Sequence, residues 1–377
     1  MSQPKIIIIG AGTAGLVLGR CLHHRGIPAI LLEKAKNSPH RNNYGITLHA
    51  QTYRPLLKVL GLDETTFRRK VAVDSPVGGT GRVSKHDSGE GDFRANRGRL
   101  EGLLAEGLDV RWESEVEDVG LGSSEELTVG LKGGEKQTST VVVGADGPHS
   151  RVREAVIEGV ELKILPFATY NGKRRVSPEE LEKTFAAAIG EGNTLEQRVG
   201  DALLQISISD RDEKEVSLSY TYSRPARLNK GEDRLYRPER PKTGARVTPE
   251  ELFVELDGLA GKLEEPFRSI FNADAVRKDR LLNWLMRSLH LDVGQLREAA
   301  KGGVVLLGDA VHAEPILGGE GANVAIEDGM RLAALIAEDR ETSLEEIYDA
   351  RGRIWEKSVG ESEAKIAEMH GTVKSSL

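Results

Sequence analysis

Three glycines in the segment "IIIIGAGTAG" have the spacing of a phosphate-binding turn. Gly10 permits a tight turn, Gly12 lets the backbone approach a pyrophosphate, and Gly15 lets a helix pack closely on the preceding strand. The first turn of that helix presents its N–H groups to the phosphates. We therefore expect a dinucleotide to bind here, in contact also with Thr13 and Ala14.

An acidic residue stands where a second strand is expected to end. The segment "IPAILLEK" is aliphatic up to Glu33 and Lys34, and together with the glycine turn it predicts a strand, helix, strand unit. A carboxylate at this point accepts hydrogen bonds from ribose hydroxyls and repels a 2′-phosphate. FAD and NAD are therefore the expected ligands, NADP is disfavoured, and Glu33 and Lys34 are candidate contacts.

A later strand is followed by another acid. Residues 304–307 are aliphatic, Gly308 lets the chain turn after them, and Asp309 is then placed at a strand end. A carboxylate in this position can hold a polyol. The ribityl chain of a flavin is such a polyol and NAD has none, so this segment favours FAD.

A cluster of glycines precedes the next helix, which we expect to begin near Asn323. Glycines leave backbone N–H groups bare, and the helix dipole adds positive potential at the same place. A flavin acquires negative charge at its N1 and C2 carbonyl edge on reduction, which such a site would stabilise. The alternative is a purely structural loop. The candidate residues are Pro315, Gly318, Gly319, Gly321, Ala322 and Asn323.

The segment "GADGPHSRVRE" gives a third strand-to-helix turn, after the aliphatic run at 141–143. Asp146 and Gly147 follow the expected strand, Ser150 is suited to cap a helix, and Arg153 lies on that helix. By itself the segment is as consistent with a capped turn as with a ligand site.

These three segments together resemble the group A flavoprotein aromatic monooxygenases, the family of p-hydroxybenzoate hydroxylase. The family patterns GxGxxG, DGxxSxxR and GDAxHxxxPxxGxGxN correspond here to "GAGTAG", "DGPHSRVR" and "GDAVHAEPILGGEGAN", in the same order along the chain. The segment "RGRLEGLL" also matches the family's Arg-x-x-Leu helix through Arg97 and Leu100. One departure is Glu320, where the family usually has Gln. A carboxylate there is expected to alter the flavin's potential or the substrate preference.

The resemblance implies a role for each matched residue. FAD would be bound by the glycine turn, Glu33, Arg97 and Asp309, and residues 319–323 would lie beside the isoalloxazine. Residues 146–153 would serve both FAD and the transient reductant. The FAD loop is expected to continue through Arg41 and Gly45.

The implied activity is that of a single-component monooxygenase. NAD(P)H, as NADPH or NADH, reduces FAD, O2 adds at flavin C4a, and the hydroperoxide gives one oxygen atom to an aromatic or polycyclic small molecule. The flavin performs the chemistry, so no catalytic side chain is assigned and His312 is interpreted as structural. The alternatives are a related reductase or other non-oxygenating flavoprotein, a scaffold protein without turnover and a nicotinamide dehydrogenase. A halogenase is disfavoured because its Trp-x-Trp-x-Ile-Pro signature is absent.

The predicted fold is α/β, a Rossmann-type FAD-binding domain with an interleaved β-rich substrate domain. The segments "LLQISISD" and "EVSLSYTY" alternate with a period of two and predict an antiparallel hairpin. In the same region Trp284 and Met286 are interpreted as core, with contact to substrate as the alternative. The expected parts are 1–73, 93–160 and 296–340 for FAD, 74–92 as a loop or hairpin, 161–295 for substrate, and 341–377 as polar C-terminal helices.

The composition of the 377 residues excludes other classes. Lys and Arg number 52 against 59 Asp and Glu, so the net charge of −7 and the absence of a basic block disfavour nucleic acid. The single cysteine, Cys21, excludes an intramolecular disulfide and a Cys-rich metal site, and we expect no metal. No apolar run is long enough to span a bilayer. A cytoplasmic location is expected, and the terminal Ser-Ser-Leu is attributed to chance.

Overall fold

The computed structural model of the chain describes residues 5–38, 43–82, 90–121, 126–189, 192–228, 233–338 and 343–371. The expectations for Arg41, for residues 83–89 and for the terminal Ser-Ser-Leu lie outside these ranges. None of the helices within them is both long and apolar enough to cross a membrane.

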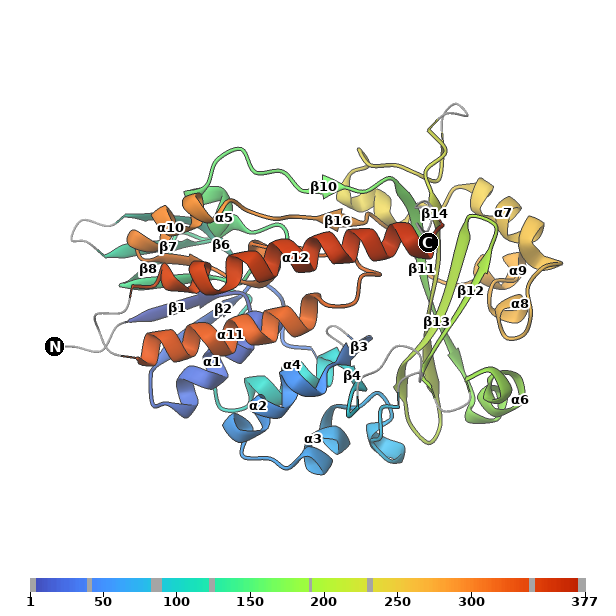
Figure 1. Cartoon of the computed structure of the whole chain (residues 1–377), viewed down its shortest axis with the longest axis horizontal. Helices are drawn as coiled ribbons and strands as arrows, with labels where there is room; N and C mark the ends of the chain where they lie inside the picture. The colour runs from blue at the N-terminus through green and yellow to red at the C-terminus, as the bar shows by residue number, and fades with distance from the viewer. Residues whose placement is uncertain are drawn as a thin grey trace.

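A five-stranded parallel sheet forms one end of the molecule (Figure 1). Apart from the edge strand at residues 109–112, its strands are short and mostly aliphatic because both faces are covered, as is usual for parallel sheets. Residues 6–9, for example, are almost entirely buried. This confirms the predicted strand, helix, strand unit and the α/β fold class. In spatial order the strands are β17 (Val304–Leu306), β9 (Val141–Gly144), β1 (Ile6–Ile9), β2 (Ala29–Glu33) and β5 (Asp109–Trp112).

Helices cover one face of this sheet and an antiparallel meander lies on the other. The helices α1 (Thr13–His24) and α11 (Gly321–Ala337) pack so closely that a Cβ at Gly329 would lie 2.9 Å from Ala14 O. The meander is β6 (Val116–Leu121), β7 (Leu127–Leu131) and β8 (Lys136–Ser139). Further helices of this part are α2 (Ala50–Leu60), α3 (Glu64–Val71), α4 (Arg97–Ala105), α5 (Arg151–Val156) and α10 (Val293–Lys301).

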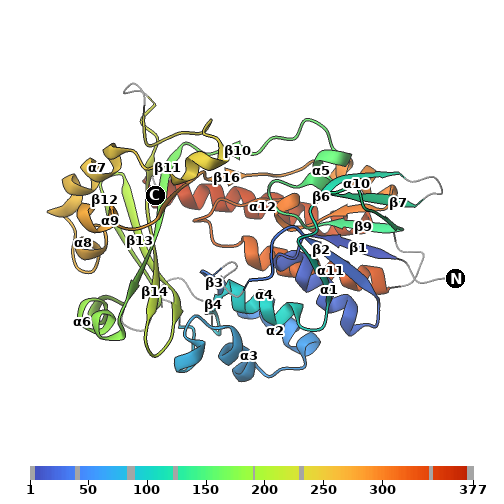
Figure 2. The same ribbon diagram turned by 180° about the vertical axis from the view of Figure 1, so that it is seen from behind.

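A second five-stranded sheet is antiparallel and stands at the other end of the molecule (Figures 1 and 2). Its order is β12 (Thr194–Val199), β13 (Ala202–Arg211), β14 (Val216–Pro225), β11 (Phe167–Val176) and β15 (Leu281–Trp284). The pairing of β13 with β14 confirms the predicted hairpin. The apolar face packs against α6 (Pro178–Ile189), α7 (Glu250–Ala260), α8 (Phe267–Ile270) and α9 (Ala273–Val276).

The other face of the antiparallel sheet is polar and is turned toward the first part of the molecule. It carries alternate residues of three strands, Asn171, Lys173, Ser219, Thr221 and Gln205. Short pairs connect the two parts: β3 (Gly45–Leu48) with β4 (Phe93–Asn96), and β10 (Lys163–Ile164) with β16 (Arg287–Ser288). The 3₁₀ turns are η1 (Ser75–Val77), η2 (Lys242–Arg246) and η3 (Gly308–Ala310).

The C-terminal region differs from its prediction. In place of several polar helices, the described residues of 341–377 form one long helix, α12 (Glu346–Met369), which runs from the parallel sheet to the antiparallel one. Its composition is polar, yet a buried stripe that includes Trp355 and Ile366 attaches it to both parts. Helix α11 also begins two residues before the expected position, because Gly321, the last glycine of the cluster, is already part of the helix.

Candidate cofactor site

The glycine turn between β1 and α1 is packed too tightly for any other residue at two of its positions. Gly10 has φ +105°, and a Cβ there would lie 2.3 Å from Ala145 O. A Cβ at Gly15 would lie 2.1 Å from Gly10 O. At Gly12 the nearest atom to a Cβ would be Arg97 Nη2, at 3.7 Å, so this glycine opens on a space rather than on a packed strand.

Glu33, the acidic residue predicted to bind a ribose, is held by backbone amides at the end of β2. Glu33 is buried, and its two oxygens accept from Ala11 N at 2.8 Å and Ala35 N at 2.9 Å. Its carboxylate is therefore fixed beside the glycine turn. Lys34 follows it with an exposed side chain.

Arg97 lies at the centre of a charged cluster facing Gly12. Its Nε donates to Glu101 Oε1 at 2.8 Å, a helical i,i+4 pair, and its guanidinium lies against the ring and hydroxyl of Tyr44. Burial would lower the pKa of Arg97, but Tyr44, Glu101 and Asp309 together outweigh burial and raise it. The cluster keeps a permanent positive charge next to the first turn of α1.

Asp309 lies on the far side of Arg97, in η3. Its carboxylate is open to solvent at its surface, although the protein around it raises its pKa through burial, against the opposing effects of Arg97 and His312. The preceding Gly308 has φ +57°, as the turn after β17 requires. The acid therefore lies on the open side of a mostly buried turn.

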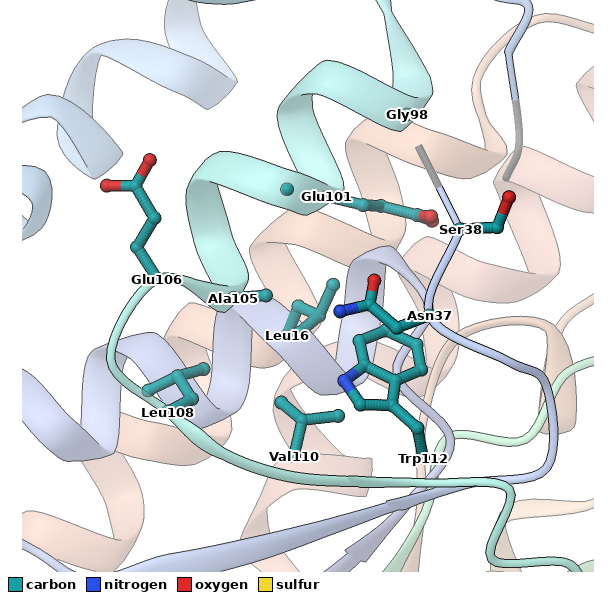
Figure 3. Close-up of a pocket in the computed structure, with 11 residues that line it drawn as sticks. Leu16, Asn37, Ser38, Gly98, Glu101, Ala105, Glu106, Leu108, Val110 and Trp112 are labelled. Carbon is teal, nitrogen blue, oxygen red and sulfur yellow. The ribbon is translucent and has the colours of Figure 1, made fainter. Parts of the chain in front are cut away.

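A pocket of about 380 Å³ adjoins this cluster, between α1, α4 and β5 (Figure 3). Glu101 points across its mouth toward Ser38, and the indole of Trp112 forms part of its wall. Its other lining residues are Leu16, Asn37, Gly98, Gly102, Ala105, Glu106, Leu108 and Val110. No sequence motif pointed to this pocket.

The side chains of the middle segment, residues 146–153, form hydrogen bonds within the protein. Asp146 accepts from Ser150 Oγ at 2.5 Å and Arg151 N at 2.7 Å, and Ser150 caps α5. Arg153 is buried and donates to Ala310 O at 3.0 Å and Pro148 O at 2.8 Å. Arg153 thus holds the turn that carries Asp309, and its contact with a cofactor stays a prediction. Gly147 supplies a positive φ of +85° between them.

The late glycine loop leads into α11 without a capping side chain. Gly319 has φ +96°, and a Cβ at Gly318 would collide with Ser362 of α12 at 2.6 Å. Asn323 is buried and bridges two backbone groups, accepting from His49 N and donating to Thr47 O, both at 3.0 Å. Of the remaining candidates, Pro315 begins this loop, Gly321 and Ala322 form the first turn of α11, and Gly45 begins β3.

His49, the residue before α2, links the loop to Asp92 ahead of β4, a contact that sequence reasoning missed. Its Nε2 lies 2.8 Å from Glu320 Oε2 and its Nδ1 lies 2.8 Å from Asp92 Oδ2. The hydrogen bond that His49 donates to Glu320, opposed by burial and supported by Asp92, raises the pKa of His49 to about 9. At neutral pH the unusual Glu320 is therefore paired with an imidazolium.

Glu320→Gln is expected to lower the pKa of His49 substantially, while Asp92 keeps it above the ordinary value of about 6.5. Because the folded pKa is raised, the pairs stabilise the wild type fully below about pH 6.5, and this contribution is lost as pH rises through 9. Glu320 is about half exposed, so we expect only about 1 kcal/mol from it near neutrality. An NMR titration of the His49 ring and urea unfolding from pH 6 to 10 measure both quantities; an unchanged pKa would contradict the pairing.

His312 is enclosed in a buried network instead of facing the site. Its Nε2 lies 2.6 Å from Asp328 Oδ2, and both side chains are fully buried. Asp328 also accepts from Arg351 and Trp355 of α12. This agrees with the structural role expected for His312.

The two N-termini at this site differ from those of five other helices. Side chains cap α3, α4, α5, α9 and α10, whereas α1 and α11 have no capping side chain, a property that they share with α2, α7, α8 and α12. Uncapped N–H groups are available to an external acceptor. Arg97, suited to a phosphate, lies near Gly12 at the start of α1. Gly308, which precedes Asp309, packs against Ala14 of α1 and Ala325 of α11, and Asp309 is suited to a polyol. The donor set fits FAD.

Comparison with known proteins agrees with this fit. The family described as FAD binding domain matches residues 3–171 and 264–356. The FAD-dependent monooxygenase vrtH of Penicillium aethiopicum is 32% identical over 390 residues, covering 97% of this chain and 92% of the relative.

Solved structures share the fold. 2,6-Dihydroxypyridine-3-hydroxylase from Arthrobacter nicotinovorans superposes with a TM-score of 0.74 at 18% identity, covering 98% of this chain and 94% of the other. HpxO of Klebsiella pneumoniae, solved with FAD and uric acid, superposes with a TM-score of 0.69 at 17% identity, covering 98% and 89%.

Proposed function

Because the chain belongs to the FAD binding domain family and is related to FAD-dependent monooxygenases along nearly its whole length, we propose that it is a single-component FAD monooxygenase. It would use NAD(P)H and O2 to place one oxygen atom in an aromatic or polycyclic small molecule. The observation that carries the proposal is that Arg97 lies near the uncapped N-terminus of α1, and that the turn carrying Asp309 packs against both α1 and α11.

Each part of the site has a place in this proposal. Glu33 would bind the adenosine ribose, with the adenine toward the pocket at Trp112; α1 and Arg97 would bind the pyrophosphate, and Asp309 the ribityl chain. The N-terminus of α11 would stabilise negative charge on the ring. When bound, FAD would supply the redox chemistry, passing electrons from NAD(P)H to O2, of which one atom enters the substrate and the other leaves as water.

The chain's own task in the reaction is to hold substrate and exclude water. The polar face of the antiparallel sheet is suited to this because its side chains are fixed in place: Asn171 Nδ2 lies within 3.0 Å of acceptors on Ser219, Tyr220 and Thr221. Such fixed polar groups orient a small molecule. We infer that this face forms the floor of the substrate site.

A cationic surface beside the middle segment is suited to the reductant. Burial and the charges of Arg287, Lys242, Arg153 and Lys34 lower the pKa of His149, so His149 lies in a positive environment to which buried Arg153 contributes. We infer that these cations receive the phosphates of NAD(P)H. Arg287→Gln is then expected to weaken NAD(P)H binding about 10-fold, with the limiting rate of flavin reduction little changed. Stopped-flow reduction at varied NAD(P)H measures both, with Arg175→Gln on a distant strand as the charge-matched control; equal affinities in the two variants would contradict the assignment.

The activity is tested by purifying the protein, recording its visible spectrum, reducing it with NAD(P)H without oxygen and then admitting air. A flavin spectrum that bleaches and recovers, with an aromatic ligand that speeds bleaching and becomes oxygenated without excess H2O2, is the expected result. Reduction of a double bond in the ligand, without oxygenation, would identify the protein as the alternative reductase. Protein that cannot be loaded with FAD would overturn the proposal.

A further inference from the structure

Arg94 carries a charge that no acidic side chain neutralises in the described part of the chain. It lies on β4, partly exposed, and its Nη1 donates to Thr47 Oγ1 at 3.2 Å. Its Nε is buried and has no hydrogen-bond partner. Burial lowers the pKa of Arg94 to about 10, and no neighbouring charge offsets this. The guanidinium remains protonated at neutral pH without an internal anion.

Several other arginines of this protein pair with carboxylates, whereas buried Arg153 is satisfied by two backbone carbonyls. Arg224 pairs with Asp233 at 2.7 Å and Glu255 at 2.8 Å, and Arg351 pairs with Asp328 at 2.8 Å. Even Arg99, five positions after Arg94 in the sequence, pairs with Asp210 at 2.6 Å. An uncompensated guanidinium away from water is costly. An anionic ligand that binds beside such a guanidinium would neutralise it and offset this cost.

The position of Arg94 places it where substrate would lie. Thr47, its hydrogen-bond partner, is held through its carbonyl by Asn323 at the N-terminus of α11. A Cβ at Gly45 would lie 2.7 Å from Arg94 Nε and 3.0 Å from Ile208 O of β13. Figures 1 and 2 show β3 and β4 between the first part of the molecule and the antiparallel sheet. Arg94 thus lies between the glycine loop and the sheet.

The facing strand adds a second cation. Lys173 of β11 lies on the polar face of the sheet, and its Nζ donates to Asn43 O at 2.7 Å. Burial and then Arg280 lower the pKa of Lys173, with no carboxylate acting on it. Asn96, which shares a face of β4 with Arg94, donates to Ser209 O of β13 at 2.9 Å and so joins the strands. The junction between the two parts therefore has Arg94 on one side and Lys173 on the other, while its carboxylate Asp210 is paired with Arg99.

We propose that Arg94 is the substrate anchor, binding an anionic oxygen group of the aromatic ligand, either a carboxylate or an ionised ring hydroxyl, with Lys173 attracting it from the facing strand. This specificity assignment rests on the proposed function, since it takes the space beside the glycine loop as the place of the ring to be oxygenated. Neutral aromatic molecules of the same shape would bind less tightly.

The test measures ligand binding to FAD-loaded protein from the change in flavin absorbance. Two pairs of probes are used: 3-hydroxy-2-naphthoate with its neutral carboxamide, and 2,4-dinitro-1-naphtholate with its neutral methyl ether. Wild-type protein is expected to bind at least one anion about 10- to 100-fold more tightly than its neutral partner. The pair that shows the preference identifies the anionic group. No preference in either pair, including no binding of either anion, overturns the assignment.

Three variants separate recognition from folding. Arg94→Met is expected to remove the preference, Arg94→Lys to keep part of it, and Arg268→Met, which removes one positive charge on the outer helix α8, to keep it in full. Arg94→Met should also melt no lower than wild type, because it loses only one bond to a neutral hydroxyl. A retained preference in Arg94→Met, or loss of folding or FAD in both Arg94 variants, overturns the proposal.

The binding measurement is independent of turnover. Protein that loads FAD and shows the Arg94-dependent preference, but never oxygenates a ligand, would contradict the monooxygenase proposal and leave the anion site standing. Oxygenation of neutral substrates with no anion preference would do the reverse.

Discussion

Gly15→Ala is expected to give a destabilised protein that no longer retains FAD. The added Cβ would lie 2.1 Å from Gly10 O, and the backbone of Gly10 cannot retreat because it already packs on Ala145. Either α1 moves away from β1 or the turn unfolds, and both disperse the N–H groups that face Arg97. We expect a loss of about 3 kcal/mol or more in the free energy of unfolding, from overpacking of a rigid contact. Urea unfolding and the ratio of flavin to protein absorbance measure the two effects.

Gly258→Ala is the matched control because Gly258 also lies inside a helix, α7, with nothing within 4 Å of an added Cβ. Alanine has the higher helix propensity, so this variant should be about 0.5 to 1 kcal/mol more stable and keep its flavin. If the same substitution changes the free energy of unfolding in opposite directions at the two positions, the difference is due to the close approach at Gly15. A Gly15→Ala protein with wild-type flavin content would show that the turn does not bind the cofactor.

The features that sequence predicted are those encoded over short stretches. Ile6–Ile9, the glycine turn and Glu33 form a unit of strand, turn, helix and strand in which each neighbour constrains the next. The same holds for the strand before Asp309 and the cap at Ser150. The expected domain boundaries and the cofactor roles of individual residues stay predictions.

The features that sequence did not predict depend on contacts between distant residues. His49 and Glu320 are 271 positions apart, and neither position shows a local pattern that marks the other. Tyr44 meets Arg97 across 53 positions for the same reason. Glu101 alone had a local signal, its i,i+4 spacing from Arg97. The unpaired charge of Arg94 among the described residues could not be predicted from the sequence either, because it is recognised only when the neighbours of Arg94 are placed.

Helix α12 shows how composition misleads when a long helix is buried along one narrow stripe. Its many charged residues predicted polar helices, but Tyr348, Trp355 and Ile366 recur on one side and are fully buried. This stripe crosses from the parallel sheet to the antiparallel one, where His370 bonds with Ser223 at 2.7 Å. The helix therefore joins the cofactor part to the sheet that we assign to substrate.

Asp328→Ala is expected to cause the largest loss of stability among side-chain truncations that avoid the cofactor site. Asp328 on α11 is fully buried and contacts His312 at 2.6 Å, Arg351 at 2.8 Å and Trp355 at 2.9 Å. Its removal leaves the buried guanidinium of Arg351 with only Glu327 as a carboxylate partner. Breaking such a pair costs about 3 to 5 kcal/mol, enough to release α12 in a domain of ordinary stability.

The pH dependence of this effect has a definite sign. Burial would raise the pKa of Asp328, but His312 and Arg351 outweigh it and lower the pKa below its ordinary value. The stabilisation is therefore complete above about pH 4, the unfolded value, and is lost as pH falls through the lower folded pKa. The difference between wild type and Asp328→Ala should narrow only in that acid range.

Asp349→Ala on the same helix is the control for this prediction. Asp349 forms an ion pair with Arg297 of α10, but both side chains are about half exposed, and exposed pairs contribute about 0 to 1 kcal/mol. Urea unfolding at neutral pH should therefore separate the two aspartates by several-fold in free energy, although each variant removes one carboxylate from one ion-paired network. Similar small losses in both would mean that the Asp328 network does not hold α12, and that its buried apolar stripe alone joins the two parts of the molecule.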